Sequence, residues 1–324
     1  MNTSSSLASP HRGIVPTDAR EVFALRLLDS LWRNYRDRVS YVRDYEEIVE
    51  TAGGTFENDH IAFRTLASQD PLIGIATLSR LFEALGYEPA GCYIFPDEEI
   101  RSIHYEHSHA GFPKLFISEL RIWEYDRPIQ DIIWSYTRQN ATNLANEDLA
   151  ALHALRGRSV AAKPDDDEAL LERLTGRFFH RPWTPPERAH LEAVNEASQF
   201  AAWVLVHGYA VNHFTALVNS HGVPELNDIE KTVQAMASHG IPMKAAIEGS
   251  AGSKLRQSAT AAVKLDVPMR EGGKETTGSW TYAYFEIAER GNVIDPESGQ
   301  PIRFEGFLGK QAAQLFEMTR VSDS

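Results

Sequence analysis

Two residues that can do chemistry stand in one short apolar segment, residues 58–66 (NDHIAFRTL). Side chains of a β-strand alternate between its two faces, so a strand here places His60, Ala62 and Arg64 on the same face. An imidazole and a guanidinium then flank a small alanine. Because a buried guanidinium is costly unless it meets an anion, we expect Arg64 to pair with an anionic group of the protein or of a ligand.

A second histidine and a glutamate lie in comparable settings further along the chain. His213 lies in residues 208–218 (GYAVNHFTALV) and Glu286 in residues 279–290 (SWTYAYFEIAER), and both segments are typical of strands. Together with His60 they offer two imidazoles and one carboxylate. Such a set can hold Fe(II) as a facial triad and leave three coordination positions open for a bidentate substrate and dioxygen.

Each of these residues also has a purely structural interpretation. A single histidine in an apolar strand is more often a hydrogen-bonded core residue than a metal ligand, and spacing alone leaves both interpretations open. A buried glutamate is rarer, because its charge needs a partner. Candidate partners that would fix the imidazole tautomers adjoin the two histidines in the sequence, namely Asn58, Asp59 and Asn212.

The elements that must position these residues occur twice in one order, which predicts a duplicated fold. In each copy, a strand that carries a histidine precedes an amphipathic helix and then further strands. The first copy has a strand at 58–66, a helix at 77–85 and strands at 91–95, 101–105 and 115–123. The second copy has a strand at 208–218, a helix at 228–239 and strands at 254–267 and 279–290.

The remaining segments surround the two copies. Residues 1–16 contain much Ser and Pro and are expected to form a disordered tail, after which Thr17 or Asp18 caps a helix. We expect residues 17–324 to form a single catalytic domain. Its parts are module one at about 55–125, a helical insert at about 126–200, module two at about 205–292, and a C-terminal closing segment at 293–324 that begins a helix after a turn.

The composition bears on several classes of protein. Lys and Arg number 32 against 45 Asp and Glu, and the net charge of −13 argues against a nucleic-acid binder, which needs a basic surface. The longest apolar run, residues 200–206, is far below the roughly 18 residues of a membrane-spanning helix, and we expect no signal peptide. The lone cysteine, Cys92, excludes an intrachain disulfide, so we expect a cytoplasmic protein.

Six motifs resemble those of one known family. In order, they are NDHIAFRTL (58–66), LFISEL (115–120), RPWTPP (181–186), AWVLVHGYAVNHFTALV (202–218), YAYFEIAER (282–290) and GFLGKQAAQLFE (306–317). Over about residues 18–320 the chain is similar to the 2-oxoadipate dioxygenase/decarboxylase (hydroxyglutarate synthase) family of the vicinal oxygen chelate superfamily. The resemblance implies an α+β fold of paired, glyoxalase-like βαβββ modules, which form a curved mixed sheet around a metal cavity.

The resemblance also implies an activity. The family's Fe(II) ligands fall on His60, His213 and Glu286, and the arginine that holds the distal carboxylate of the substrate falls on Arg64. The chain would then use dioxygen to decarboxylate and hydroxylate a 2-oxo diacid, above all 2-oxoadipate to 2-hydroxyglutarate and CO₂ in lysine catabolism. Because the chain is shorter than many family members, the resemblance implies the reaction class more directly than the length of the diacid.

Two further groups of residues are candidates for a site. Ser258 and Thr260 share a strand face with Arg256, and the pattern leaves substrate contact and plain packing equally open. Three histidines in residues 103–111 (IHYEHSHAG) do not share one strand face and are expected in a solvated loop, namely His104, His107 and His109.

Two other functions compete with the dioxygenase. Glu119 stands in copy one where Glu286 is expected in copy two; as a fourth ligand it would favour a glyoxalase-like metal-dependent isomerase or lyase. The second competitor is a metal-free protein that binds a small molecule, which would purify without iron and consume no oxygen. Mn, Co and Zn also suit the ligand set, so the residues alone do not select the metal.

Overall fold

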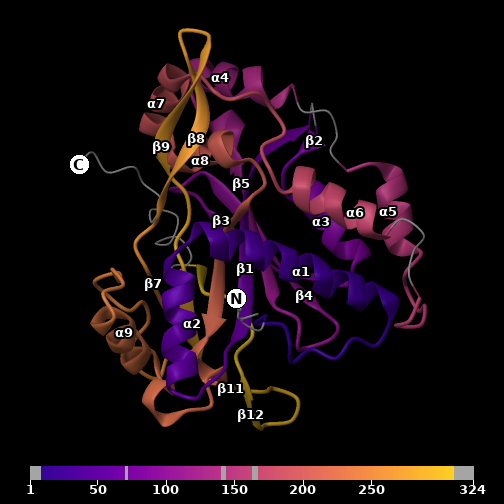
Figure 1. Ribbon diagram of the computed structural model, residues 1–324, viewed down its shortest axis with the longest axis vertical. Coiled ribbons are helices and arrows are strands. Elements are labelled where there is room, and N and C mark those ends of the chain that lie inside the picture. The colour runs from indigo at the N-terminus through magenta and orange to yellow at the C-terminus, as the bar shows by residue number, and fades with distance from the viewer. Residues whose placement is uncertain (1–8, 70–71, 140–143, 163–166, 310–324) are drawn as a thin grey trace, which may run out of the picture.

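A curled, mixed β-sheet forms the centre of the computed structural model, which describes residues 9–69, 72–139, 144–162 and 167–309 (Figure 1). The strand order is β3-β4-β5-β1-β6-β10-β7, and β2 pairs with β1 beside this path. The strands are β1 (Glu57–Gln69), β2 (Leu72–Ile73), β3 (Tyr87–Phe95), β4 (Ile100–His107), β5 (Lys114–Arg121), β6 (Val211–Leu217), β7 (Leu255–Ala259) and β10 (Glu286–Arg290). The predicted α+β class is confirmed.

The sheet consists of two modules that meet at its middle. The first contains β1, α3 and β3–β5, and the second contains β6, α9, β7 and β10, where the helices are α3 (Ile75–Ala84) and α9 (Ile229–Ser238). The two modules join through antiparallel β1 and β6, with His60 opposite Thr215 and Ala62 opposite His213. Within each module the first and last strands are parallel neighbours, β1 with β5 and β6 with β10. The predicted duplication is therefore present.

The second module has an irregular segment where the first has β3. Residues 242–248 make two isolated bridges to the β7 region, Met243 with Thr260 and Glu248 with Gln257. The backbone N–H groups of Glu248 and Gln257 donate to each other's carbonyl oxygens at 2.8 and 3.0 Å. This segment therefore covers the outer edge of β7 although it is not a regular strand.

The strands predicted at 254–267 and 279–290 are each broken, which corrects their boundaries. Their inner parts are β7 and β10, and their outer parts form a separate hairpin of β8 (Lys264–Glu271) and β9 (Lys274–Thr281). At the break, Thr260 N–H donates to Phe285 O at 2.9 Å, and Phe285 N–H donates to Thr260 Oγ1 at 3.0 Å. A side chain thus replaces one bond of the ladder, and the chain leaves the main sheet there.

The β8–β9 hairpin projects from the body of the protein near α7 and α4 (Figure 1). It turns at Gly272 and Gly273, whose φ angles of 57° and 81° suit a two-residue turn that most side chains resist. Near this turn the hairpin is joined to the helical insert, because Arg270 N–H donates to Pro186 O at 2.8 Å.

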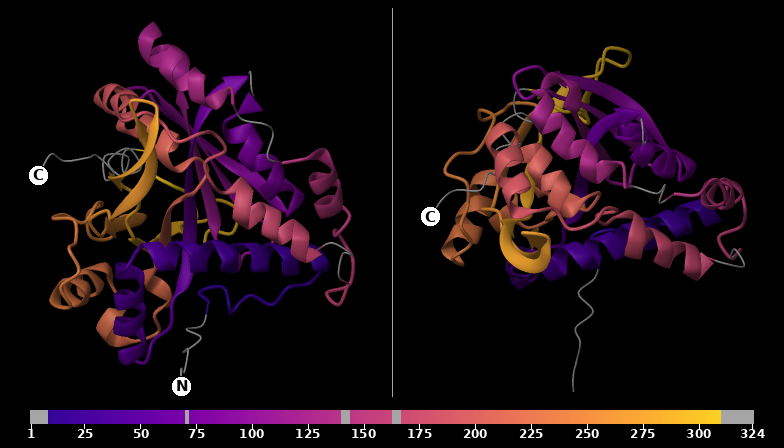
Figure 2. Two further views of the ribbon diagram at one scale, coloured as in Figure 1. Left: turned by 45° about the horizontal axis from the view of Figure 1, so that its top comes forward. Right: turned by 90° about the horizontal axis from the view of Figure 1, so that it is seen from above.

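Two N-terminal helices pack beside the second module. Helix α1 (Ala19–Arg38) begins as predicted at Asp18, whose carboxylate accepts a hydrogen bond from Glu21 N–H at 2.9 Å. Helix α2 (Tyr41–Thr51) follows; α1 packs against β6 and α2 against α9 (Figure 2).

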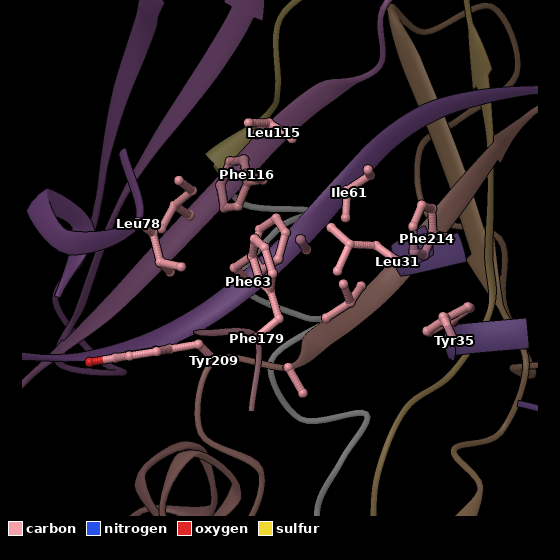
Figure 3. Close-up of a cluster of buried hydrophobic side chains, with 14 of the residues drawn as sticks. Leu31, Tyr35, Ile61, Phe63, Leu78, Leu115, Phe116, Phe179, Tyr209 and Phe214 are labelled. Carbon is pink, nitrogen blue, oxygen red and sulfur yellow. The ribbon is translucent and has the colours of Figure 1, made fainter. Parts of the chain in front are cut away.

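Strand β1 divides the core from the candidate site. Ile61 and Phe63 point into the main hydrophobic cluster, where Phe214 of β6 and Leu31 of α1 also lie (Figure 3). The intervening side chains, His60 among them, face the other way because strand side chains alternate. One strand therefore both anchors the fold and presents its chemical groups.

The helical insert supplies a buried helix behind Arg64. Its helices are α4 (Arg127–Thr137), α5 (Asn146–His153), α6 (Asp167–Arg173), α7 (Arg188–Ala197) and α8 (Gln199–His207). Every residue of α8 is buried, and Trp203 Nε1 donates to Tyr282 O at 2.5 Å. Such a helix, apolar on all sides, is a core element.

Within the described ranges no helix combines the length and apolar character that a membrane crossing demands.

The two ends of the described chain both return to the sheet. Residues 1–16 were predicted to form a disordered tail, but residues 9–16 contact the rest of the protein. Buried His11 lies 2.8 Å from Asp29 and 3.3 Å from Asn58. After β10, a ribbon of β11 (Asn292–Ile294) and β12 (Pro301–Arg303) leads residues 304–309 back to the sheet. Residues 1–8 and 310–324, with most of the predicted C-terminal helix, lie outside the described residues.

Candidate metal centre

Three adjacent strands bring His60, His213 and Glu286 to one point. His60 lies opposite Thr215, which is two residues after His213, and Thr215 in turn lies opposite Glu286. One nitrogen or oxygen from each residue lies within 4.8 Å of the other two. Glu286 Oε1 is 3.5 Å from His60 Nε2, and Oε2 is 3.5 Å from His213 Nε2. The structure therefore brings together the three residues expected to converge.

Both imidazoles are held at Nδ1 and turn Nε2 toward the carboxylate. His60 Nδ1 donates to Asp59 Oδ2 at 2.7 Å, and His213 Nδ1 donates to Asn212 Oδ1 at 2.9 Å. Such bonds fix the tautomer and ring plane of a metal-ligating histidine. Of the three expected partners, Asn58 differs, because its amide donates to backbone carbonyl oxygens of β1 and β6.

The surroundings favour neutral imidazoles beside an ionised Asp59. Burial lowers the pKa of His60, although Asp59 opposes the effect, and burial together with His60 and Arg64 lowers the pKa of His213 further. A neutral imidazole keeps the Nε2 lone pair that a metal requires. Burial would raise the pKa of Asp59, but the charge of Arg290 and the hydrogen bond from His60 hold it well below its usual range.

Glu286 is the group of this site that most needs a cation. Its side chain is fully buried; Gln257 Nε2 donates to Oε1 at 2.5 Å, and Oε2 has no hydrogen-bond partner among the described residues. Burial and the charge of Glu248 raise the pKa of Glu286 well above its usual range. A divalent cation would supply the missing charge, and two nitrogens with one oxygen suit Fe, Mn, Co or Zn. The residues therefore fit a metal ion.

Both histidines of the triad line a small cavity of about 30 Å³, enough for water. Besides the two histidines, its walls include Ala62, Arg64, Phe116, Gln257, Tyr284 and Phe307. The Tyr284 ring stacks on His213 with a centroid distance of 4.8 Å. A larger groove of about 840 Å³ lies between α3, α4 and β3–β5, but no triad residue lines it. Because the histidine nitrogens that could bind a metal border the smaller cavity, we take that cavity as the candidate site.

Arg64 lies in the cavity wall, on the same strand as His60. Its side chain is buried, and the guanidinium carbon lies 4.9 Å from the ring centroid of Phe200 and 5.5 Å from that of Trp203. Arg64 Nη1 also donates to Gln199 Oε1 at 3.5 Å. Helix α8 thus packs two aromatic faces against the cation, which holds the guanidinium beside the cavity.

Ser258 and Thr260 do not line the cavity, so of the two possibilities that the sequence left open the structure favours packing. Gln257, between Arg256 and Ser258, occupies the cavity wall instead. Ser258 Oγ is buried without a hydrogen-bond partner among the described residues, and Thr260 Oγ1 bonds to Phe285 N–H. The odd-numbered residues of β7 share the face of Glu286 because Ala259 lies opposite Glu286 and Gln257 opposite Ala288.

Glu119 is committed to other partners, which contradicts its role as a fourth ligand. Its Oε2 accepts a hydrogen bond from Ile75 N–H at 2.7 Å, at the start of α3, and its Oε1 pairs with Arg101. Negative charge at this end of a helix is stabilising. Among the described residues, the candidate metal group comprises only His60, His213 and Glu286.

The counterpart of Glu119 in the second module is Glu289, not Glu286. Glu289 Oε2 accepts a hydrogen bond from Ile229 N–H at 2.7 Å, at the start of α9. It also lies opposite Arg256 on the neighbouring strand, 3.7 Å from its Nη1, as Glu119 lies opposite an arginine of β4. Each module thus uses one strand carboxylate to hold the start of its own helix.

The three histidines expected in a solvated loop are mostly buried. His104 and His107 belong to β4 and are buried, which corrects that expectation. His104 Nδ1 bonds to Tyr93 OH at 3.0 Å, and His107 Nε2 donates to Leu85 O at 3.1 Å. His109 Nδ1 lies 3.2 Å from Glu21. Separate partners therefore satisfy the three rings.

Comparison with known proteins agrees with the geometry. Residues 27–300 match the family model for 2-oxoadipate dioxygenase/decarboxylase. The chloroplastic 2-oxoadipate dioxygenase/decarboxylase of Arabidopsis thaliana is 27% identical over 342 residues, which cover 98% of this chain and 83% of that protein.

Two solved structures show the same fold. Hydroxyglutarate synthase from Oryza sativa, in complex with 2-oxoadipate, aligns with a TM-score of 0.73 at 24% identity and covers 95% of this chain and 96% of its own. A glyoxalase superfamily protein from Ralstonia eutropha aligns with a TM-score of 0.77 at 24% identity, over 90% of this chain and 93% of its own.

Proposed function

Because this chain belongs to the 2-oxoadipate dioxygenase/decarboxylase family, we propose that it is an Fe(II)-dependent enzyme that decarboxylates and hydroxylates a 2-oxo diacid. With 2-oxoadipate, one dioxygen gives 2-hydroxyglutarate and CO₂. One oxygen atom enters the new carboxylate and the other the new hydroxyl group. That substrate would place the enzyme in lysine catabolism, and the single Cys92 is compatible with a reducing cytoplasm.

The observation that carries this proposal is the buried carboxylate of Glu286 between two imidazoles. Its Oε2 lacks a hydrogen-bond partner among the described residues and lies 3.5 Å from His213 Nε2. Three protein ligands would leave positions for both substrate and dioxygen. Fe(II) bound there would supply dioxygen activation and would polarise the 2-oxo acid.

The chain's own residues would bind and orient the substrate. We assign Arg64 to the distal carboxylate, which a guanidinium can hold through two parallel hydrogen bonds. Ala62, between His60 and Arg64, leaves space along the wall for the carbon chain of the diacid. Gln257 fixes one oxygen of Glu286, and the rings around the cavity keep water away from the reacting carbons.

The competing functions make different demands on the site. A glyoxalase-like isomerase or lyase with Glu119 as ligand is disfavoured, because Glu119 holds the start of α3. A metal-free binding protein would have to keep the buried Glu286 without a cation, although burial disfavours its charged form.

Anaerobic reconstitution with Fe(II), followed by oxygen uptake with 2-oxo diacids of increasing length, tests the proposal. We expect one CO₂ and one hydroxy acid, shorter by one carbon, per oxygen consumed, with the highest rate for 2-oxoadipate. Stoichiometric metal without oxygen uptake on any 2-oxo diacid would contradict the dioxygenase. Purification without metal and failure to bind it would favour the binding protein.

A further inference from the structure

Residues 304–308, which we call the roof segment, close one side of the cavity. The ring of Phe307 lies 4.9 Å from the ring of His60, nearly perpendicular to it, and 4.9 Å from the ring of Phe116. Phe307 N–H donates to Tyr93 OH at 3.3 Å. The roof segment thus touches a candidate metal ligand directly.

A single buried guanidinium joins this roof segment to the other side of His60. Arg290 Nε and Nη2 donate to Asp59 Oδ1 and Oδ2 at 2.5 and 2.8 Å. Arg290 Nη1 donates to Phe304 O at 3.0 Å and Gly306 O at 2.9 Å. The guanidinium carbon also lies 5.3 Å from the centroid of the Phe307 ring.

We propose that Arg290 is a positioning residue that locks the His60 imidazole and the roof segment into one arrangement, so that metal binding and closure of the cavity favour each other. The proposal rests on the proposed metal centre. Through Asp59, Arg290 sets the ring that would bind the metal; through two carbonyl groups, it seats the roof segment. Because coupling between two binding events is reciprocal, each should strengthen the other.

The cavity is too small for a 2-oxo diacid unless the roof segment or another part of its wall moves. The cavity of about 30 Å³ is far smaller than the roughly 300 Å³ at the low end of ligand pockets. A 2-oxo diacid therefore requires part of the wall to move. Two carbonyl bonds to Arg290 hold the roof segment, together with an ion pair between Glu305 and Lys114. The carbonyl bonds can open while the paired bonds to Asp59 persist. A lysine at position 290 keeps the charge, but its single ammonium group cannot bond to the Asp59 carboxylate and to the roof carbonyl groups at once.

The test measures the metal site and the roof segment separately in the full-length protein. Metal affinity is measured with Co(II) by competition with a chromophoric chelator. Opening is measured as the rate of chymotrypsin cleavage after Phe304 and Phe307, with and without Co(II). In the wild type we expect saturating Co(II) to slow cleavage about tenfold, a typical coupling.

The decisive variant is Arg290→Lys, with Arg256→Lys as its matched control. Arg256 is also buried and pairs with carboxylates, but the contacts of its side chain lie on Glu230 and Glu289. We expect Arg290→Lys to weaken Co(II) binding about 10–100-fold, to speed cleavage and to abolish the effect of Co(II) on it. The control should match the wild type in all three respects.

A second variant, Asp59→Asn, keeps Arg290 and changes no residue of the roof segment. It should nevertheless speed cleavage after Phe307, and this result supports the coupling even if Arg290→Lys does not fold. If Arg290→Lys and Asp59→Asn weakened Co(II) binding but left the cleavage rate unchanged, the inference would be overturned and the proposed function would stand. Absence of Co(II) binding in the wild type would overturn both.

Discussion

Phe116 occupies, in the first module, the position that Glu286 occupies in the second. Phe116 lies opposite the residue two positions after His60, and Glu286 lies opposite the residue two positions after His213. The duplicated fold therefore has four equivalent strand positions, and the candidate ligands His60, His213 and Glu286 occupy three of them. The fourth position carries the apolar ring of Phe116, which lines the cavity and would supply no ligand to a metal held by the other three.

Substitution of Glu286 and of Glu119 should have different effects, the first on metal affinity and the second on stability. Glu286→Gln removes the charge between the imidazoles, so we expect metal affinity to fall by more than the roughly 10–100-fold that an outer partner costs. Glu119→Gln removes the charge at the start of α3 and should cost about 1 kcal/mol of stability with metal affinity unchanged. Metal titration and thermal unfolding of both variants measure these effects. Equal loss of metal in the two variants would restore Glu119 as a ligand.

Arg64→Met should affect the diacid and not the metal. Methionine keeps an unbranched side chain between Phe200 and Trp203 but cannot bind a carboxylate. Loss of a hydrogen-bonded ion pair of about 1.5–3 kcal/mol predicts kcat/KM for 2-oxo diacids lower by about 10–100-fold. Turnover of a 2-oxo monoacid of equal length is the internal control and should change little. If the variant lost its metal, Arg64 would instead support the triad.

Acid should destabilise the metal-free protein through His207. Burial lowers the pKa of His207 to about 3, and its Nε2 donates to Thr281 O at 2.9 Å. Because the unfolded chain takes up a proton near pH 6.5 and the folded state does not, the unfolding free energy falls as pH drops below 6.5. The loss from this residue is about 1.4 kcal/mol per pH unit, or about 2 kcal/mol at pH 5.

Denaturant titrations between pH 7 and 5 check the effect of His207. The variant His207→Gln should show a shallower dependence on pH than the wild type by that amount, since the other buried histidines are common to both. The exposed His153→Gln is the matched control and should reproduce the wild-type slope. A His207→Gln slope equal to that of wild type would mean that His207 does not contribute.

Local periodicity predicted the elements that bury one face. Residues 58–66 alternate between core and chemical side chains, and the structure puts Phe63 in the core and His60 on the cavity. Helix α9 begins at Asp228, as its side chain suggests, because the carboxylate accepts a hydrogen bond from Lys231 N–H. These features depend on neighbours in sequence, so the sequence reveals them.

Features set by pairing between distant segments were not predictable in the same way. Residues 254–267 alternate well enough to suggest one strand, but the break at Thr260 depends on Phe285. Whether Gln257 or Ser258 faces the cavity depends on the register with β10. The roof segment has no periodic pattern, and the place of Phe307 beside His60 depends on bonds to distant residues, Arg290 and Tyr93.

Because Phe116 stands where the second module has Glu286, one substitution there should reduce oxygen uptake while metal binding is kept. Phe116→Glu places a carboxylate at the position equivalent to Glu286, on the cavity wall. A fourth ligand should bind the cation at least as tightly as the wild type and occupy a position needed for the bidentate substrate or dioxygen. We therefore expect undiminished Co(II) affinity and oxygen uptake reduced at least about tenfold, with Phe116→Gln as the uncharged control. The same oxygen uptake in both variants would show that the open side of the metal is not the side that Phe116 borders.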